Sequence, residues 1–422
     1  TQAFVASLPF DLTPGQKQSA WEIIQDMGQS KPMLRILQGD VGSGKTVVAC
    51  LAALNAALAG AQAAFMVPTE ILAFQHFQTI SNKLYAKESI TVALFTRSYR
   101  LIRRPGSEAE ELTKAQMLKA LEDGEIQLAI GTHALIQDTV AFRNLGLVII
   151  DEQHRFGVEQ RGLLTEKAQG GRPSSAPPGA SAGTMPHLLS MTATPIPRSL
   201  ALALYGDLDV SLIKELPAGR KKIITELVGE KKRAETYEAI AKELDAGHQA
   251  FIVCPLIDPS DKLGARSVTL EHKRLNESVF KNYSVGLLHG RLKAPEREAV
   301  MRDFADGKLQ LLVATSVIEI GVDIPNATVM LVEDADRFGL AQLHQYRGRV
   351  GRSDFQSYCY LMSDSADERS QERLSSLIAF DSGFDLARAD LKFRGPGEVY
   401  GLAQKGFPEL KMANFYDVEL IK

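Results

Sequence analysis

The residues best suited to chemistry lie in the stretch QGDVGSGKT, at residues 38–46. Four residues separate Gly39 from the Gly44-Lys45-Thr46 triplet, which is the spacing of a phosphate-binding loop. Glycines let backbone N–H groups turn toward a phosphate, the lysine reaches its terminal oxygens, and the threonine hydroxyl ligates Mg²⁺. The flanking strand-like and helix-like runs make a chance glycine-rich turn the weaker alternative. The predicted nucleotide ligands are Gly42, Ser43, Gly44, Lys45 and Thr46.

A pair of carboxylates, Asp151 and Glu152, follows the apolar run LGLVII. Open α/β sheets bind ligands beyond the carboxyl ends of their strands, so these side chains are candidates for the same site. Asp151 can hold the metal, directly or through water, and Glu152 can orient and deprotonate the attacking water. Alone, such a pair is more simply explained as a helix N-cap. The phosphate-binding loop upstream favours hydrolysis instead.

Two arginines in HQYRGRVGR, Arg349 and Arg352, are three positions apart, and we predict that they share one face of a helix. They would be arginine fingers that reach the γ-phosphate across a cleft, because a guanidinium stays charged and binds two oxygens. The alternative is a solvated basic helix end. The nearby segment ATSVIEIGVDIP (314–325) favours the fingers. ATP would then bridge two domains, and hydrolysis would release them.

The amino-terminal part of the chain offers an aromatic and an amide for adenine recognition. Phe10 could stack on a purine, and Gln16 could read the adenine edge. The same stretch also resembles a helix start, with Thr13 as N-cap, Pro14 at the first position and Trp21 in the core. The two interpretations are compatible, because such a helix could present Gln16.

Three further segments are candidate strand-end loops, PTEILAFQH (68–76), GTHAL (131–135) and TATPIPR (192–198). Their backbone N–H, threonine and histidine groups could meet a nucleic-acid backbone. Ordinary capped turns explain each of them about as well.

These residues need a scaffold, and the chain repeats a pattern of short apolar runs separated by amphipathic stretches. This pattern predicts parallel sheets covered by helices, that is, an α/β fold of two tandem parallel-sheet domains. A helix over 232–247 is expected to end at a glycine. The first set of expected strands is 33–38, 63–68, 126–131, 145–151 and 187–193, and the second is 250–257, 285–290, 309–315, 328–334 and 357–363.

The composition narrows the class of protein. The net charge of −3 provides no global basic field, so any nucleic-acid binding must be local. The three cysteines form no CxxC pair, which favours a reducing compartment without disulfides or a zinc site. The apolar stretch 46–68 follows the phosphate-binding loop and is interpreted as a buried helix and a strand, not a membrane span. The Gly-, Pro- and Ser-rich stretch 168–186 is expected to be a mobile insertion.

Five segments occur in the order QGDVGSGKT, IDEQHRFGVEQR, MTATPIPR, VATSVIEIGVDIPNA and QLHQYRGRVGR. Together they resemble the motifs of superfamily 2 helicases, and their sequences are most similar to those of the RecG family of bacterial branched-DNA helicases. DLARADLKFRGPGEVYG (385–401) resembles the translocation motif that this family shares with the transcription-repair coupling factor. The stretch 94–108 departs from the family where Arg97 replaces a usual glycine, and nothing before Phe10 resembles the family's wedge domain. Since no initial Met is present, the chain is expected to be a fragment.

The resemblance implies RecA-like domains at 1–206 and 223–365, a linker at 207–222, and a helical hairpin with a C-terminal segment at 366–422. It implies ATP and Mg²⁺ as ligands and adds Gly321 and Asp323 as nucleotide contacts. The residues that it carries over to DNA contact or coupling are Thr132, His133, His154, Thr192, Thr194, Thr315, Gln345, Arg388, Arg394 and Gln404.

The function that the resemblance implies is an ATP-dependent translocase or helicase that remodels forks and four-way junctions in recombination and repair. Its partners would be branched double-stranded DNA and a single-strand-binding protein, not a membrane. The protein would be a monomer in the bacterial cytoplasm, associated with the nucleoid. Three alternatives stay open: the motor of a transcription-repair coupling factor, an ATP-gated DNA clamp, and an RNA helicase.

Overall fold

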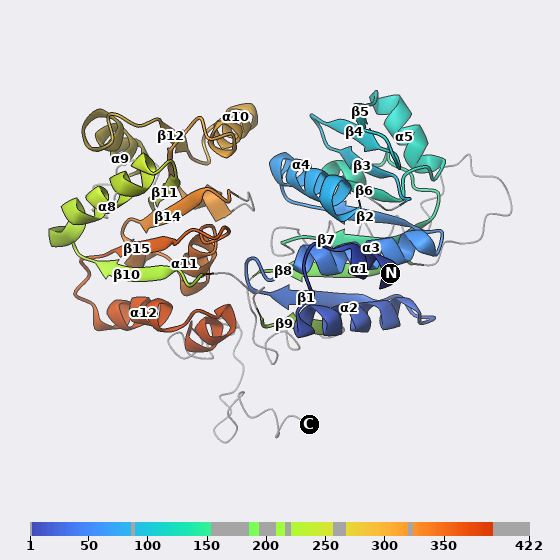
Figure 1. The fold of residues 1–422 in the computed structure, drawn as a ribbon, viewed down its shortest axis with the longest axis horizontal. Helices are drawn as coiled ribbons and strands as arrows, with labels where there is room; N and C mark the ends of the chain where they lie inside the picture. Colours follow the sequence, from blue (N-terminus) through green and yellow to red (C-terminus); the bar gives the residue numbers. More distant parts are fainter. Residues whose placement is uncertain are drawn as a thin grey trace, which may run out of the picture. The chain divides into compact units, whose positions relative to one another are not determined.

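The computed structural model describes residues 2–85, 89–152, 185–193, 208–215, 221–255, 267–319 and 324–390 (Figure 1). The chain forms two compact units, each with its own sheet. The first unit comprises Thr1–Gly39, Ser43–Ala193 and Asp207–Pro217, and the second comprises Asp40–Gly42, Thr194–Gly206 and Ala218–Lys422. This arrangement confirms the predicted pair of α/β domains.

The first sheet has nine strands in the order β5-β4-β3-β6-β2-β7-β8-β1-β9. All strand pairs are parallel except β3–β4 and β4–β5, which are antiparallel. The strands are Leu34–Gly39 (β1), Gln62–Met66 (β2), Val92–Phe95 (β3), Arg100–Arg103 (β4), Ala109–Glu111 (β5), Leu128–Gly131 (β6), Leu145–Ile150 (β7), His187–Thr192 (β8) and Asp209–Ile213 (β9).

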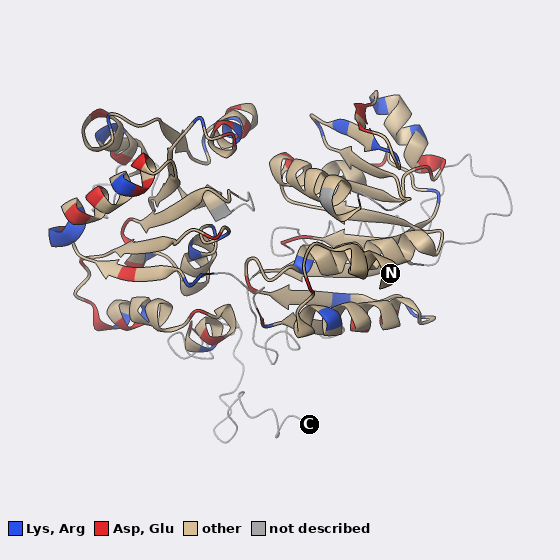
Figure 2. Ribbon diagram, viewed as in Figure 1, with Lys and Arg blue, Asp and Glu red and all other residues tan. Residues whose placement is uncertain are grey.

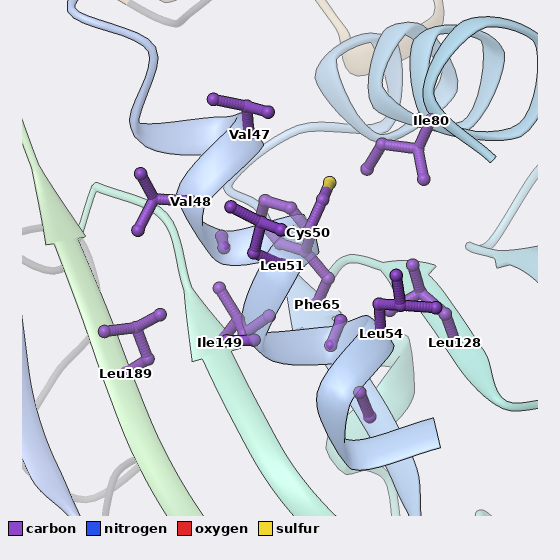
Figure 3. Close-up of a cluster of buried hydrophobic side chains, with 14 of the residues drawn as sticks. Val47, Val48, Cys50, Leu51, Leu54, Phe65, Ile80, Leu128, Ile149 and Leu189 are labelled. Carbon is purple, nitrogen blue, oxygen red and sulfur yellow. The ribbon is translucent and has the colours of Figure 1, made fainter. Parts of the chain in front are cut away.

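Helices cover both faces of this sheet. They are Gln2–Ser7 (α1), Pro14–Met27 (α2), Lys45–Leu58 (α3), Glu70–Thr79 (α4) and Lys114–Glu122 (α5), with short helical turns at Ile80–Leu84 (η1) and His133–Ile136 (η2). Helix α3 is rich in Ala, Val and Leu, and it packs Val48, Leu51 and Leu54 against one face (Figure 3). There it meets Phe65 of β2 and Ile149 of β7. Neighbouring residues of β7 point to the opposite face, where α5 packs, so the central strand is buried on both sides.

Helix α2 begins as its sequence predicts. The side chain of Thr13 accepts a hydrogen bond from the backbone of Gln16, the amide oxygen of Gln16 accepts one from the backbone of Thr13, and Pro14 is at the first position. The expectation that Trp21 lies in the core is wrong, because its side chain is 59% exposed. The buried face of α2 is carried by smaller neighbours, Ala20 and Ile23.

Four strands of the first sheet were not predicted from the sequence. β3 is a short apolar run, and β4 and β5 are rich in charged residues that hide the strand pattern. The departure from the family at 94–108 therefore forms an antiparallel extension, with Arg97 in the turn between β3 and β4. β9 lies inside the stretch 207–222 that was predicted to be a linker, and it pairs with β1. This part of the predicted linker therefore belongs to the first sheet.

The second sheet is parallel throughout, in the order β10-β15-β14-β11-β13-β12. Its strands are Ile224–Val228 (β10), Gln249–Val253 (β11), Val285–Leu288 (β12), Leu311–Ala314 (β13), Ala327–Val332 (β14) and Tyr358–Met362 (β15). Five of these strands match the predicted runs within a few residues, and only the edge strand β10 was missed.

The helices of the second unit are Arg233–Asp245 (α8), Val268–Arg274 (α9), Ala294–Ala305 (α10), Leu340–Arg347 (α11) and Glu368–Ala379 (α12), with short turns at Glu230–Lys232 (η4), Leu275–Val279 (η5), Ser316–Glu319 (η6) and Ala335–Arg337 (η7). The predicted glycine stop of α8 is confirmed, because Gly247 follows the helix with φ of 85°. α8 and α9 pack on one face of the sheet, while α12 contacts α11 and β10. The stretch after residue 366 thus begins with a helix of the second unit.

A buried ion pair links α8 to the end of β14. The guanidinium of Arg233 donates to both carboxylate oxygens of Glu333, at 2.5 and 2.9 Å, and to the hydroxyl of Tyr237 at 2.7 Å. Burial, with the charge of Glu333, raises the pKa of Tyr237 to about 12. Removing one partner of such a pair is strongly destabilising, because the other charge stays buried.

Within the described ranges, no helix is long and apolar enough to cross a membrane. The stretch 46–68 forms most of α3 and the strand β2, as predicted. Cys50, Cys254 and Cys359 are free and buried. The proposed insertion at 168–186 lies outside the described residues up to position 184, and β8 follows it as expected.

Candidate nucleotide-binding site

The predicted site residues of the first unit follow neighbouring parallel strands. Gly39 ends β1, Asp151 follows β7 and Thr132 follows β6. Thr192, the last residue of β8, is paired with Gln38 of β1. Parallel strands end at the same edge of a sheet, so these residues lie along one edge. Gly39 of the phosphate-binding loop and Asp151 of the predicted nucleotide site thus share this edge with Thr132 and Thr192, which were predicted to contact DNA.

The phosphate-binding loop turns by means of two left-handed glycines, Gly42 with φ of 79° and Gly44 with φ of 83°. Side-chain-bearing residues rarely adopt this conformation. A Cβ atom at Gly44 would also overlap the side-chain nitrogen of Gln16. Helix α3 begins at Lys45, so its free N–H groups and positive dipole end face the loop. The local geometry is that of an anion-binding turn.

The two reactive side chains of the loop sit at the start of this helix. The ammonium of Lys45 donates to the carbonyl of Gly39 at 2.8 Å, so it lies beside the first residue of the phosphate-binding loop. Thr46 is half-buried. The hydroxyl of Ser43 is buried, and no hydrogen-bond partner for it occurs in the described part of the chain.

The side chain of Gln16 stabilises the phosphate-binding loop. Its side chain is 2% exposed, and its amide nitrogen donates to the carbonyl of Ser43 at 2.8 Å. Its amide oxygen accepts from the backbone N–H of Thr13 at 2.9 Å. Both ends of the amide are therefore engaged within the protein, and contact with an adenine stays a prediction. Phe10 is 47% exposed, so its ring has a face available for the predicted stacking.

The two carboxylates after β7 are held differently. The backbone N–H of Asp151 donates to the carbonyl of Met66 at 2.9 Å, which extends the sheet by one residue. One carboxylate oxygen of Asp151, Oδ1, accepts from the backbone N–H of Glu152 at 3.0 Å. Glu152 has φ of 54°, a left-handed conformation that is uncommon for residues other than glycine and clusters at functional sites. The chain thus turns sharply at the predicted general base.

His76 of α4 is a neighbour of Asp151 that the sequence analysis did not assign to the nucleotide site. Its Nε2 atom lies 3.5 Å from Oδ2 of Asp151, and the two side chains are only 13% and 14% exposed. The ring centroids of His76 and Phe65 are 5.0 Å apart. No local pattern links position 76 to position 151, because only the packing of α4 on the sheet brings them together.

Magnesium prefers oxygen ligands, and this edge carries suitable ones. Asp151 is a half-buried carboxylate at a strand end, and among the described residues no lysine or arginine forms an ion pair with it. Thr46 supplies a hydroxyl at the helix start. The donor set therefore fits Mg²⁺ together with a phosphate oxygen.

The expectation for the arginines of the second unit needs a correction. Helix α11 ends at Arg347, and Gly351 has φ of 71°, so Arg349 and Arg352 lie in a turn and not on one helix face. Gly348 caps the helix, which explains why the helical spacing fails. Arg349 is 4% exposed, and Arg352 donates to the carbonyl of Gly348 at 3.1 Å.

A third arginine of the same segment, Arg347, was also missed. Its guanidinium donates to the carbonyl of Leu377 at 2.6 Å and to that of Asp381 at 2.9 Å. It is 4% exposed, and burial lowers its pKa. Arg347 therefore fastens the end of α11 to the end of α12, a contact between residues 30 and 34 positions apart.

The remaining predicted residues differ in their exposure to solvent, and several lie outside the described residues. His133 is exposed and Thr132 is half-buried, whereas Thr192, Thr315 and Gln345 are buried. In the segment predicted to form a hairpin, residues 383–390 are helical, and the side chain of Arg388 is 79% exposed. The positions outside the described residues are His154, Thr194, Gly321, Asp323, Arg394 and Gln404.

Comparison with known proteins identifies both units. Residues 13–202 match the family model described as DEAD/DEAH box helicase, and residues 231–354 match the helicase conserved C-terminal domain. The ATP-dependent DNA helicase RecG of Thermotoga maritima is 48% identical over 422 residues, which is 100% of this chain and 51% of that protein. That of Synechocystis sp. is 47% identical over 419 residues, which is 99% of this chain and 47% of that protein. The chain spans about half the length of the curated relatives it matches.

A solved structure of RecG bound to a three-way DNA junction has the same fold. It matches with a TM-score of 0.76 at 45% sequence identity, covering 94% of this chain and 49% of that chain. A structure of Mss116p bound to single-stranded RNA and AMP-PNP matches with a TM-score of 0.62 at 17% identity, a likeness that concerns the fold alone.

Proposed function

This chain belongs to the RecG family of ATP-dependent DNA helicases, and from that premise we propose that it is the ATP-driven motor of a protein that remodels branched double-stranded DNA. The observation that carries the proposal is the convergence of the phosphate-binding loop and the Asp151–Glu152 pair on one sheet edge. The chain is 48% identical throughout to a RecG protein, and a RecG structure contains a DNA junction.

Hydrolysis would depend on positioning and on charge. The loop N–H groups and Lys45 would hold the β- and γ-phosphates, and Thr46 with Asp151 would hold the metal. Bound Mg²⁺ would neutralise charge on the phosphate oxygens. Glu152 would orient the attacking water and accept its proton. Arg349 and Arg352 are proposed as arginine fingers for the γ-phosphate.

DNA contact is proposed for the strand-end groups of the sheet edges, among them Thr132 and His133. Exposed Arg388 is the described member of the candidate coupling residues in the hairpin. A monomeric state, a single-strand-binding protein as partner and association with the nucleoid are further proposals from the family resemblance.

The test of the catalytic assignment is the Glu152→Gln variant. We expect ATP binding to remain, since the phosphates are held by the loop, and turnover to fall by about 10²-fold or more, because a general base contributes about 10²–10⁴-fold. Steady-state ATPase rates and equilibrium binding of a fluorescent ATP analogue measure the two effects. Lys45→Ala serves as the control that should lose binding. Unchanged turnover in Glu152→Gln would exclude the assigned role.

The test of the DNA assignment compares four-way junctions, linear duplex and RNA as activators of the ATPase. Junctions should stimulate it most. Stimulation by RNA alone would favour an RNA helicase. Displacement of the third strand of a DNA triplex separates a motor from an ATP-gated clamp, because a clamp cannot push a strand off.

A further inference from the structure

We propose that His76 is a positioning residue that holds the carboxylate of Asp151 in the orientation in which it would bind Mg²⁺. The inference deepens the proposed ATPase function and rests on it. The geometry that supports it lies entirely within the first unit. Nε2 of His76 lies 3.5 Å from Oδ2 of Asp151, with both side chains largely buried.

The two oxygens of the Asp151 carboxylate have separate neighbours. Oδ1 accepts from the backbone N–H of Glu152 at 3.0 Å. Oδ2 faces the imidazole of His76. A carboxylate bound on one oxygen alone can still rotate about its last torsion, and a second polar neighbour limits that rotation. His76 thus restricts the direction in which the ligand oxygens point.

The histidine is in turn held by its own surroundings. It lies on α4, whose first turn is capped by the Thr69 side chain, and its ring is 5.0 Å from that of Phe65 in β2. Nε2 is buried, and within the described residues it has no hydrogen-bond partner. At 3.5 Å it is slightly beyond hydrogen-bonding distance from Asp151. With its proton on Nε2, the ring needs only a small approach to donate to that oxygen.

The competing explanation is that His76 only fills space over Phe65. A packing role and a positioning role make different predictions. Loss of packing would disturb α4 and the sheet edge in general, including the binding of nucleotide without metal. Loss of positioning would weaken only the response to metal, since residues that hydrogen-bond to metal ligands typically change metal affinity by about 10–100-fold.

The experiment measures binding of a fluorescent ADP analogue to the purified 422-residue chain, first in EDTA and then over a series of Mg²⁺ concentrations. The test variant is His76→Leu, which keeps apolar volume and removes the ring nitrogen. His76→Gln restores an N–H donor of similar reach. Phe77→Leu is the matched packing control, because Phe77 is buried on the same helix.

We expect His76→Leu to bind the analogue normally in EDTA and to need about ten-fold more Mg²⁺ for the half-maximal response. His76→Gln should recover most of the difference, and Phe77→Leu should not shift the Mg²⁺ midpoint. An unchanged midpoint in His76→Leu, or an equal shift in Phe77→Leu, would overturn the inference.

Asp151→Asn separates this inference from the proposed function. If the wild-type chain responds to Mg²⁺ and Asp151→Asn does not, the metal assignment holds, and a normal His76→Leu response then refutes the role of His76 alone. If neither the wild type nor Asp151→Asn responds to Mg²⁺, the proposed metal site fails, and the inference fails with it.

Discussion

His187, the first residue of β8, is a single side chain whose protonation state is set by its surroundings. Its Nδ1 atom accepts a hydrogen bond from the backbone N–H of Met33 at 3.0 Å, which requires an unprotonated nitrogen. Burial lowers the pKa of His187 below its usual 6.5, and the nearby charge of Asp26 only partly opposes this. The folded state therefore favours the neutral imidazole ring of His187 over the protonated one.

The sign of the resulting pH dependence follows from this lowered pKa. The unfolded chain binds a proton at this site more readily, so the stabilisation is fully present above pH 6.5 and is lost as pH falls through the folded-state pKa. In His187→Asn, an amide oxygen can replace the acceptor without titrating. We expect this variant to lose less unfolding free energy than the wild type between pH 7.5 and 5.5, by urea denaturation. Exposed His133→Asn is the control, and identical slopes for His187→Asn and the wild type would refute the assignment.

At the scale of elements, the turn from β1 into α3 is the feature on which the site depends. Its shape requires Gly44 at φ of 83°, with no room for a Cβ atom beside Gln16. Gly60, after the same helix, has a similar φ of 78° but nothing within 4 Å of the position of a Cβ atom. The two glycines share a backbone conformation and differ in their surroundings, so they form a natural pair for comparison.

Gly44→Ala should combine backbone strain with a clash against Gln16. An alanine in the left-handed region costs about 1–2 kcal/mol. At position 44 the loop can relieve this strain and the clash with Gln16 by leaving the conformation that binds the phosphates, so we expect nucleotide affinity to fall about ten-fold or more, since 1.4 kcal/mol is ten-fold. Gly60→Ala should carry a similar backbone cost in urea unfolding and leave nucleotide affinity unchanged. Titration with a fluorescent ADP analogue measures both variants. Equal effects of the two on affinity would show that the loop geometry is not specific.

At the scale of the whole molecule, charge is balanced. The net charge is −3, and acidic and basic residues are interspersed on helices such as α8, as Figure 2 shows. No sign of charge dominates the described helices in a way that would attract DNA at a distance. Any phosphate contact must come from a few local groups, and Arg388, which we propose as one of them, is exposed.

We therefore expect duplex binding to be strongly salt-dependent. Six neutralised phosphates would lower the affinity about 10³-fold between 50 and 200 mM salt. Fluorescence anisotropy over a salt series gives the slope of log affinity against log salt concentration. Arg388→Ala should reduce the magnitude of this slope by about 1, the value for one lost phosphate contact. Lys308→Ala, which removes an exposed lysine paired with Asp303 and Asp306, is a control of the same charge change. A slope near zero would argue against backbone-directed binding.

The sequence by itself determined the local parts of this protein. The spacing of Gly39, Gly44 and Lys45 defines an anion-binding turn, because its geometry is made within a few residues. The apolar runs located most strands, and the alternation with helices predicted parallel sheets. The cap of α2 at Thr13 and the end of α8 at Gly247 were predictable for the same reason.

The tertiary structure alone decided the contacts between distant positions. Only the fold shows Gln16 supporting Ser43, His76 facing Asp151 and Arg347 fastening α12. It also placed β9 in the first sheet and ended α11 before Arg349. Spacing along a chain encodes backbone conformation over one or two turns. Periodicity in the sequence shows which face of an element is buried, but tertiary packing alone settles which distant side chain meets that face.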